Sequence, residues 1–462
     1  MLRIALLLPD LPDLSSIQGK IRVILSLNEG KIVIWDELVA EWGARVLPTI
    51  TPRRVRTRGI PGKADALIGM RRSGKTWQLL GEIAAERAAG VPVGRTLYLS
   101  FEDERLMGID ASTLGGLLDA WFRRCPDAAT GPVWLALDEV QAIPGWEHFV
   151  RRILDSGRIR VAVTGSSARL LSREIATTLR GRSLATEVLP FGFDEWLVHR
   201  GIEAPTRWPP TPAERASLGH ALDTYLEVGG FPEVVNLSFT DRRDVLRDYV
   251  DVVLLRDVVE RHGDANVPAL RRIVQRFVSS PGSTFSVHKL SQDLRSQGIG
   301  VGKDLLYAYV DHVEDAFLGF RVPIRTESER VRATNPTKVY PVDPGLARAF
   351  ASRTEPGHLL EAAIYLELRR RGGDVTWYRT AHGYEIDFVL DGEGGPALVQ
   401  VCAVIEDEAT RDRELRALDE AMAELSVREA VVVTSGERAE WQRPGGVVTA
   451  VPAWEWLLRR GA

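Results

Sequence analysis

An octapeptide at residues 69–76, Gly-Met-Arg-Arg-Ser-Gly-Lys-Thr, constrains this chain more than any other stretch. It fits the pattern G-x-x-x-x-G-K-[ST], with an apolar strand-like run before it (64–68) and a helical run after it (77–89). A strand, a glycine-bent loop and a helix in this order form a phosphate-binding loop, because the loop N–H groups and the helix N-terminus point at one anion. The alternative is a glycine turn that matches by chance, and the flanks on both sides weigh against it.

The residue types in this loop predict how a nucleotide would be held. Lys75 would contact the β- and γ-phosphates of ATP, and Thr76 would offer its hydroxyl to Mg²⁺. The chain has 7 lysines among 59 basic residues, so a lysine at this position indicates a need for a compact ammonium rather than a planar guanidinium. The predicted nucleotide-binding residues are Gly69, Arg71, Arg72, Ser73, Gly74, Lys75 and Thr76.

A second apolar run, residues 132–138, ends in the acid pair Asp138 and Glu139. Downstream of a phosphate-binding loop, this pattern is typical of a Walker B strand. Asp138 would hold Mg²⁺, directly or through water, and Glu139 would orient and deprotonate the attacking water. The alternative is a strand that ends in a solvated acidic turn, and the loop upstream favours the functional interpretation.

Two arginines further along are candidates for contact with a transition-state phosphate. Residues 158–164 predict a strand, and Arg180 and Arg182 precede the next one, over 184–189. Either arginine could reach the phosphate, in its own chain or in a neighbouring copy. The alternative for both is a surface salt bridge.

The middle of the chain is predicted to contain a helical segment followed by a mixed segment of strands and helices. Residues 201–280 carry apolar residues at three- and four-residue spacing, interrupted by Gly-Gly-Phe-Pro at 229–232, which fits a helical lid over the nucleotide. Residues 281–345 have the order of a winged helix: a short strand, two helices (to 297 and over 303–317) and two extended segments. The second helix would read DNA, but its expected outer face is acidic, so packing against protein is the alternative. The acids are Asp304, Asp311, Glu314 and Asp315.

Residues 346–462 predict a second α/β unit. Its element order resembles the restriction-endonuclease-like fold with its PD-(D/E)xK motif. Glu361 and Asp387 stand where that fold places metal-holding carboxylates, but the next strand offers Gln400-Val401-Cys402, without the second acid and the lysine. Because the unit contains no lysine, and the last lysine of the chain is Lys338, we expect a catalytically inactive nuclease fold.

Taken together, the ordered motifs resemble the archaeal and bacterial AAA-type ATPases that carry a winged helix and a nuclease-like C-terminal domain. The motifs that carry the resemblance are residues 69–76, 137–141, 164–167, 179–182, 229–232, 338–346 and 385–388. The resemblance implies an ATP-binding and ATP-hydrolysing core. It also implies that a polar residue at the tip of the 158–164 strand senses the γ-phosphate. Ser166 is our choice there, with Thr164 and Ser167 as neighbours and a helix-capping serine as the alternative.

Composition limits the other possibilities. A net charge of −4 argues against a chain that coats nucleic acid along its length, although a local basic patch remains compatible. Two cysteines, Cys125 and Cys402, cannot form a disulfide framework or a zinc cluster, which fits a reducing cytoplasm. The N-terminal apolar run is too short for a secretory signal, and no apolar run is long enough for a membrane span.

These observations predict an α/β protein: a P-loop NTPase core of AAA type (49–200), a helical lid (201–280), a winged helix (281–345) and a nuclease-like domain (346–462), after an N-terminal segment (1–48) of uncertain structure. In that segment, 20–27 and 31–35 could be short strands, and 35–42 has helical spacing. The predicted function is a Mg²⁺-dependent ATPase that acts as a conformational switch or motor, with DNA, a homo-oligomeric ring or another protein as candidate partners. The alternatives are a nucleic-acid-processing enzyme with an active nuclease domain, and a scaffold that binds nucleotide without turnover.

Overall fold

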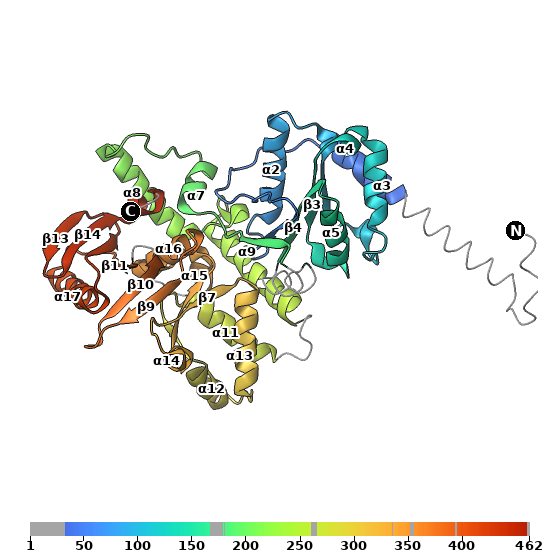
Figure 1. Ribbon diagram of the computed structural model, residues 1–462. Helices are drawn as coiled ribbons and strands as arrows, with labels where there is room; N and C mark the ends of the chain where they lie inside the picture. Colours follow the sequence, from blue (N-terminus) through green and yellow to red (C-terminus); the bar gives the residue numbers. More distant parts are fainter. Residues whose placement is uncertain are drawn as a thin grey trace, which may run out of the picture.

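The computed structural model describes residues 33–166, 179, 181–259, 266–334, 336–351, 355–392 and 395–459. Arg180, Ser167 and the strand predicted over 20–27 lie outside these residues. Figure 1 shows an N-terminal α/β unit and a C-terminal sheet on opposite sides of the molecule, with helix α9 (Phe239–Val252) between them.

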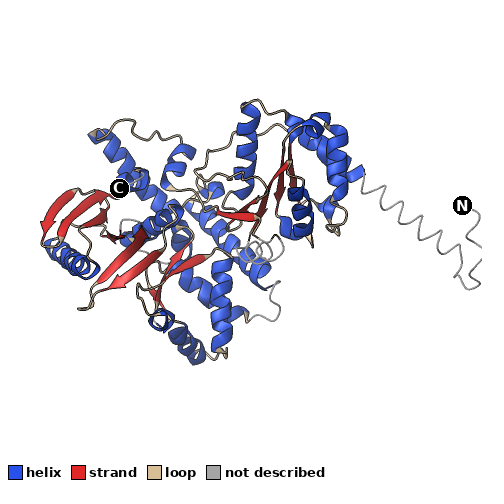
Figure 2. Ribbon diagram, in the orientation of Figure 1, coloured by secondary structure: helices blue, strands red, loops and turns tan. Residues whose placement is uncertain are grey.

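Five parallel strands form the sheet of the N-terminal unit, in the order β2-β3-β4-β1-β5. β3 is buried along its whole length, as a strand covered by helices on both faces must be. Figure 2 shows helices on both sides of this sheet. The strands are β1 (Ala64–Ile68), β2 (Thr96–Ser100), β3 (Val133–Asp138), β4 (Ile159–Gly165) and β5 (Ser183–Glu187), and the longer helices are α2 (Lys75–Ala88), α3 (Gly115–Arg124) and α5 (Trp146–Asp155).

The register of this sheet brings two sequence motifs to one edge. β4 lies between β1 and β3, with Ile68 paired to Gly165 and Leu137 paired to Val163. Because the three strands run in the same direction, their carboxyl ends meet at one edge. Asp138 and the loop that follows Ile68 therefore flank the tip of β4.

Helices fill the next part of the chain. α8 begins with a capping box in which Glu214 N donates to Thr211 Oγ1 at 3.3 Å and Thr211 N donates to Glu214 Oε2 at 2.7 Å. Gly229, with φ of 82°, follows the helix and turns the chain. The helices are α7 (Phe193–His199), α8 (Pro212–Val228), α9 (Phe239–Val252), a π-helical stretch (Val253–Val259) and α11 (Val267–Ser279).

A three-stranded antiparallel sheet, in the order β6-β8-β7, follows α11. The element order agrees with the sequence prediction except for the short helix α14, which lies between the two extended segments and was not predicted. The assignment to the winged-helix class stays a prediction. The elements are β6 (Thr284–Phe285), α12 (Val287–Ser296), α13 (Lys303–Asp315), β7 (Gly319–Val322), α14 (Glu329–Thr334), β8 (Thr337–Pro341) and α15 (Pro344–Phe350).

The C-terminal unit has a six-stranded mixed sheet in the order β13-β14-β12-β11-β10-β9. Its last three elements, β13, β14 and α18, were not predicted from the sequence. The elements are α16 (Pro356–Arg370), β9 (Val375–Arg379), β10 (Glu385–Gly392), β11 (Gly395–Val401), α17 (Glu408–Leu425), β12 (Glu429–Thr434), β13 (Ala439–Arg443), β14 (Gly446–Pro452) and α18 (Ala453–Leu458).

Helix α16 lies inside the molecule, and every residue from Leu359 to Leu368 is buried. One continuous apolar core joins α8, α9, α11, the three-stranded sheet and α16, whereas α17 and the other face of the C-terminal sheet form a separate cluster. The predicted lid, winged helix and nuclease-like domain thus share a core. Within the described ranges, no helix combines the length and apolar character that crossing a bilayer requires.

The structure corrects the prediction for the N-terminal segment. Residues 33–44 form a helix, so the strand expected over 31–35 is wrong for its described part, and the helical spacing from Trp35 to Trp42 is confirmed. Trp35 and Trp42 are buried in the core of the N-terminal α/β unit. Trp42 Nε1 donates to Thr96 O at 2.6 Å, which ties this helix to β2.

Candidate nucleotide site and a second carboxylate cluster

The loop between β1 and α2 depends on two glycines. Gly69 and Gly74 have φ values of 155° and 103°, which residues with a Cβ rarely adopt. A Cβ on Gly69 would lie 2.3 Å from Val188 O, and one on Gly74 would lie 2.7 Å from Arg53 Nη1. Both positions therefore require glycine, for conformation and for space.

Lys75, the first residue of α2, points its ammonium into this loop. Its Nζ donates to the carbonyl oxygens of Gly69 and Met70 at 3.0 Å each and lies 3.9 Å from Glu139 Oε1. The buried Ser73 Oγ beside it has no hydrogen-bond partner among the described residues. A central ammonium and an unpaired hydroxyl within a glycine-bent loop fit a ligand with anionic oxygens, such as a nucleotide phosphate.

The Asp138 carboxylate accepts hydrogen bonds from three hydroxyl groups. Thr76 Oγ1 and Tyr98 OH donate to Asp138 Oδ2 at 2.8 and 2.7 Å, and the Thr164 hydroxyl donates to Oδ1. Burial and the charge of Asp138 raise the pKa of Tyr98, which keeps its phenol protonated as a donor. The Asp138 carboxylate and the Thr76 hydroxyl together offer oxygen ligands of the kind that Mg²⁺ prefers. Tyr98 was not predicted as a site residue, because the sequence around a tyrosine in an apolar strand does not indicate which side chain its hydroxyl will contact.

Glu139 follows β3 in a left-handed backbone conformation, with φ of 52° and ψ of 49°. Such a conformation costs a residue other than glycine about 1–3 kcal/mol. Glu139 N donates to Thr164 Oγ1 at 2.9 Å, and Gln141 donates a hydrogen bond to the carboxylate. The turn directs the Glu139 carboxylate toward Lys75 rather than away from the loop.

The structure separates the remaining predicted residues. Ser166 is fully buried directly after β4, at the same edge as Asp138. Arg182 precedes β5, and its backbone oxygen accepts from Ala64 N at 2.8 Å, so it lies at the opposite end of the sheet. The five residues of β1 put about 16 Å between those ends. Arg182 forms an ion pair with Asp155, so the expectation that it contacts phosphate in its own chain is wrong.

Arg53 was not predicted as a site residue, but it contacts the phosphate-binding loop through hydrogen bonds. Its guanidinium donates to Ser73 O at 3.1 Å, to Leu189 O at 2.6 Å and to Glu195 Oε1 at 3.1 Å. Burial opposes ionisation of Glu195, but the Arg53 charge and backbone N–H groups outweigh it and lower the pKa of Glu195. The pair is therefore charged, and it fixes one side of the loop.

The Gly-Gly-Phe-Pro turn lies against the other side of the loop. Arg72 Nη1 is 3.3 Å from Glu233 Oε2 and its guanidinium lies 5.8 Å from the Tyr249 ring centre, while Arg71 pairs with Glu102 at 3.1 Å. Further along, Gly230 N donates to Asp343 Oδ2 at 2.6 Å. The turn contacts the segment after β8, and Glu233, which follows the turn directly, contacts the phosphate-binding loop.

A second cluster lies in the C-terminal unit and corrects a prediction. No lysine was expected near Glu361 and Asp387, because residues 346–462 contain none. Lys338 of β8 reaches them from the three-stranded sheet: its Nζ lies 3.2 Å from Glu361 Oε1 and 2.8 Å from Asp387 Oδ1. A third acid, Glu385, lies 2.9 Å from the same ammonium.

The other two residues of the predicted nuclease site have structural partners. Gln400 Oε1 accepts from Asp387 N at 3.1 Å, and its Nε2 donates to Glu414 Oε2 at 2.8 Å. Cys402 Sγ donates to Val404 O at 3.3 Å, and burial raises the pKa of Cys402 to about 11. Gln400 therefore orients Asp387, whereas the Cys402 thiol stays protonated and points elsewhere.

Comparison with known proteins agrees with the first site. An AAA domain model matches residues 62–197, and two models for domains of unknown function match residues 219–357 and 356–456. The parallel sheet, the glycine-bent loop and the AAA match define the class: the core has a P-loop NTPase fold of AAA type.

The chain is 30% identical over 453 residues to an uncharacterized protein of Methanocaldococcus jannaschii, which covers 95% of this chain and 98% of that protein. The chain belongs to the family of this archaeal protein. An uncharacterized protein of Haemophilus influenzae is 26% identical, over 73% of this chain and 82% of its own length.

Solved structures resemble the chain more distantly. The Walker-type ATPase of Pyrococcus abyssi has a TM-score of 0.42 at 15% identity, covering 66% of this chain and 99% of its own. Aeropyrum pernix ORC1, solved in complex with DNA, has a TM-score of 0.28 at 13% identity, covering 70% of this chain and 91% of its own. AMPPCP-bound DnaA from Aquifex aeolicus has a TM-score of 0.26 at 14% identity, with coverages of 61% and 86%.

Proposed function

We propose that this protein is a Mg²⁺-dependent ATPase that works as a conformational switch. The observation that carries the proposal is the convergence of the two motifs. The Thr76 hydroxyl lies 2.8 Å from Asp138, and the Lys75 ammonium lies 3.9 Å from Glu139, although more than 60 residues separate them in sequence. A loop for phosphate, oxygens for a metal and a second carboxylate are the parts that ATP hydrolysis requires.

Each residue has a distinct task in this proposal. The loop N–H groups and Lys75 bind the phosphates, and Thr76 and Asp138 hold the metal. When bound, Mg²⁺ neutralises phosphate charge. Glu139 orients water and accepts its proton, and its Gln141 contact limits where the carboxylate can point. Ser166 is a candidate γ-phosphate contact, because it lies at the tip of the strand between the two motifs.

Steady-state phosphate release tests the proposal. Glu139→Gln should retain ATP binding and lose at least about 100-fold in turnover, because removing a general base typically costs a factor of about 10²–10⁴. Lys75→Ala should lose binding as well. Matched controls are Glu104→Gln and Lys289→Ala, exposed residues outside the site.

The same measurement separates the proposal from a nucleotide-binding scaffold. Equal phosphate release by wild type and Glu139→Gln, with ATP binding intact in both, would favour the scaffold. Absence of ATP binding by the wild type would contradict both functions.

A ring assembly depends on an arginine from a neighbouring copy. Since Arg182 is remote from its own loop, it could contact phosphate only in trans; the alternative is a surface salt bridge, which its pairing with Asp155 fits. Size-exclusion chromatography of wild type and Lys75→Ala with ATP tests this role. An ATP-dependent rise in mass in the wild type alone supports a ring, and an unchanged mass contradicts it.

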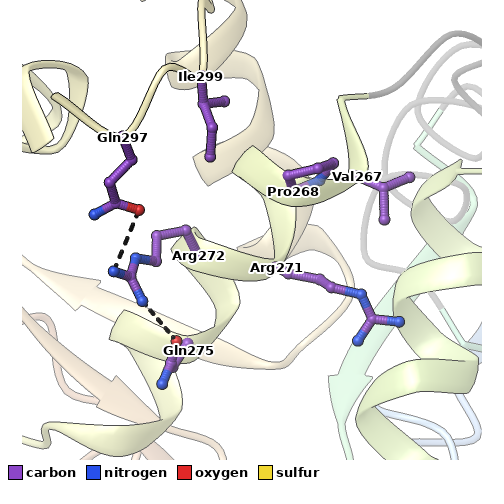
Figure 3. Close-up of a pocket in the computed structure, with 7 residues that line it drawn as sticks. All are labelled: Val267, Pro268, Arg271, Arg272, Gln275, Gln297 and Ile299. Carbon is purple, nitrogen blue, oxygen red and sulfur yellow. Dashed lines mark hydrogen bonds between the residues drawn. The ribbon is translucent and has the colours of Figure 1, made fainter. Parts of the chain in front are cut away.

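DNA contact is a second candidate function, through a surface other than the one expected. Helix α13 was the candidate reading helix, with packing against protein as the alternative. Its acids Asp311 and Glu314 pair with Arg321 of β7 at 2.8 and 2.7 Å, which favours packing. By contrast, α11 carries three arginines and no acid. Figure 3 shows a hollow where Arg272 bonds to Gln275 and Gln297 while Arg271 points to the other side, where it pairs with Asp251 at 2.6 Å.

Fluorescence anisotropy with duplex DNA at several salt concentrations tests this surface. Arg271→Ala with Arg272→Ala should weaken binding and lower the salt dependence by about two counterions. Arg207→Ala, an exposed arginine elsewhere, is the control. Unchanged binding in the double variant would exclude this surface.

We also propose the division into core, lid, winged helix and nuclease-like unit, with residues 33–44 as part of the core. The burial of Trp35 and Trp42 in the core of the N-terminal α/β unit supports that addition.

A further inference from the structure

The cluster around Lys338 joins two units of the chain. β8 places Lys338 and Tyr340 on one face, because alternate residues of a strand point the same way. Lys338 contacts Glu361 and Asp387, and Tyr340 OH donates to Glu361 Oε1 at 2.7 Å. The two acids come from α16 and β10, so one strand of the three-stranded sheet supplies the donors and the C-terminal unit supplies the acceptors.

The carboxylate oxygens in this cluster are already occupied. Asp387 Oδ1 accepts from Lys338, and Asp387 Oδ2 accepts from Val401 N at 3.0 Å. Glu361 Oε1 accepts from both Lys338 and Tyr340. The Gly282 backbone covers the other side, where an added Cβ would lie 2.5 Å from Glu361 Oε2. A metal ion at this pair would have to displace the ammonium and separate the two units.

Burial explains why a cation is needed here. Lys338, Glu361 and Asp387 are 2%, 8% and 9% exposed. Two close carboxylates in such a place repel each other, and each loses its hydration, unless a positive charge lies between them. The three surrounding carboxylates raise the pKa of Lys338 despite its burial, so the ammonium stays charged.

A divalent metal, which the nuclease-like fold implies, does not fit these residues as they stand. The ammonium lies within 3.2 Å of three carboxylates, where such an ion would bind, and Gln400 uses its amide on Asp387 N and Glu414. Within the described ranges, no group of three His, Cys, Asp or Glu side chains is arranged to hold a metal ion.

We propose that Lys338 is a built-in cation that takes the place of a divalent metal at the Glu361–Asp387 pair. By this contact the three-stranded sheet closes the nuclease-like site to metal and to the phosphates of nucleic acid. The site is therefore closed by a contact within the chain, and not only altered by the loss of the second acid. The inference does not depend on the ATPase activity.

Removing the ammonium should convert the closed pair into a metal site. Lys338→Met keeps most of the aliphatic stem and removes the ammonium from between the two buried carboxylates. His358, with Nδ1 3.7 Å from Glu361 Oε2, remains beside Glu361 alone. Measured on the full chain without nucleotide, the unfolding midpoint of Lys338→Met should fall by about 5 °C and should rise again with millimolar Mn²⁺. Wild type and the exposed control Lys303→Met should show no Mn²⁺-dependent shift.

A second substitution identifies the ligand. Lys338→Met combined with Asp387→Asn should lose the Mn²⁺ response, because one carboxylate is gone. If Lys338→Met does not fold, the test uses the wild type and Asp387→Asn. Mn²⁺ binding and DNA cleavage are then measured for both proteins. Binding or cleavage that depends on Asp387 in the wild type would overturn the proposal, and so would a folded Lys338→Met that ignores Mn²⁺. No Asp387-dependent binding or cleavage in the wild type supports it.

Discussion

Asp343 shows how much one buried carboxylate does at the scale of a residue. It follows β8, caps α15, and accepts from Gly230 N at 2.6 Å and Gly345 N at 2.9 Å. Burial raises the pKa of Asp343 to about 6, even though these N–H groups favour the charged form. The turn that touches the phosphate-binding loop is thus held by a titratable group.

The stability of the protein should therefore depend on pH through Asp343. Between about pH 4 and pH 6 the folded chain binds more protons at Asp343 than the unfolded chain does, so its contribution to the free energy of unfolding falls as pH rises, by about 3 kcal/mol. Asp343→Asn cannot titrate, and its urea-unfolding free energy should fall less between pH 4.5 and 6.5. Asp374→Asn, at an exposed position, is the control. Equal pH slopes in wild type and Asp343→Asn would contradict the assignment.

At the scale of elements, the structure is stabilised by segments that each contact two other elements. Arg53 precedes β1, touches the loop between β1 and α2 through Ser73 O, and pairs with Glu195 on α7. α16 carries Glu361 near its start, and Glu367 near its end accepts from Arg54 at 2.7 Å. Neighbouring arginines at 53 and 54 thus connect the nucleotide loop with the helix that lies inside the molecule.

Breaking the Arg53–Glu195 pair should be strongly destabilising. Both side chains are 4% exposed, and removing one partner of a buried pair typically costs about 3–5 kcal/mol. We expect Arg53→Met to lower the free energy of unfolding by about this amount. Adding Glu195→Gln should recover part of the loss, since the unpaired charge is then removed. A double-mutant cycle in urea measures the coupling, and additive effects would show that the two residues act separately.

At the scale of the whole molecule, the apolar core sets which parts move together. The core that includes α8, α9 and the three-stranded sheet is continuous, and it reaches Met70 beside the phosphate-binding loop. The α17 side of the C-terminal sheet belongs to another cluster. A change at the nucleotide should therefore pass into the middle of the molecule and not to α17.

Hydrogen exchange with mass spectrometry tests this division. ATP bound to Glu139→Gln should slow amide exchange at residues 229–234 and 341–346, because the turn lies between the loop and Asp343. Exchange in α17 should stay unchanged, and Lys75→Ala with ATP is the control. Protection confined to residues 69–76 would contradict the coupling.

Local patterns were sufficient for most elements of this fold. β1 has the bounds that its apolar run predicted, because the burial of a strand depends on the alternation or run of apolar residues within it. The missed elements β13, β14 and α18 follow a segment without strong periodicity. Residues 31–35 misled the prediction, since Trp35 begins a helical stripe and does not end a strand.

The sequence by itself determined the phosphate-binding loop and the acid pair, because both motifs are short and their conformation depends on neighbouring residues. Only the tertiary structure decided what reaches them from far along the chain. In the folded chain Tyr98 and Thr164 contact Asp138, and Arg182 lies at the end of the sheet opposite the phosphate-binding loop. The last lysine of the chain, Lys338, lies between Glu361 and Asp387. Strand direction and burial fix such contacts, and neither is contained in the spacing of a motif.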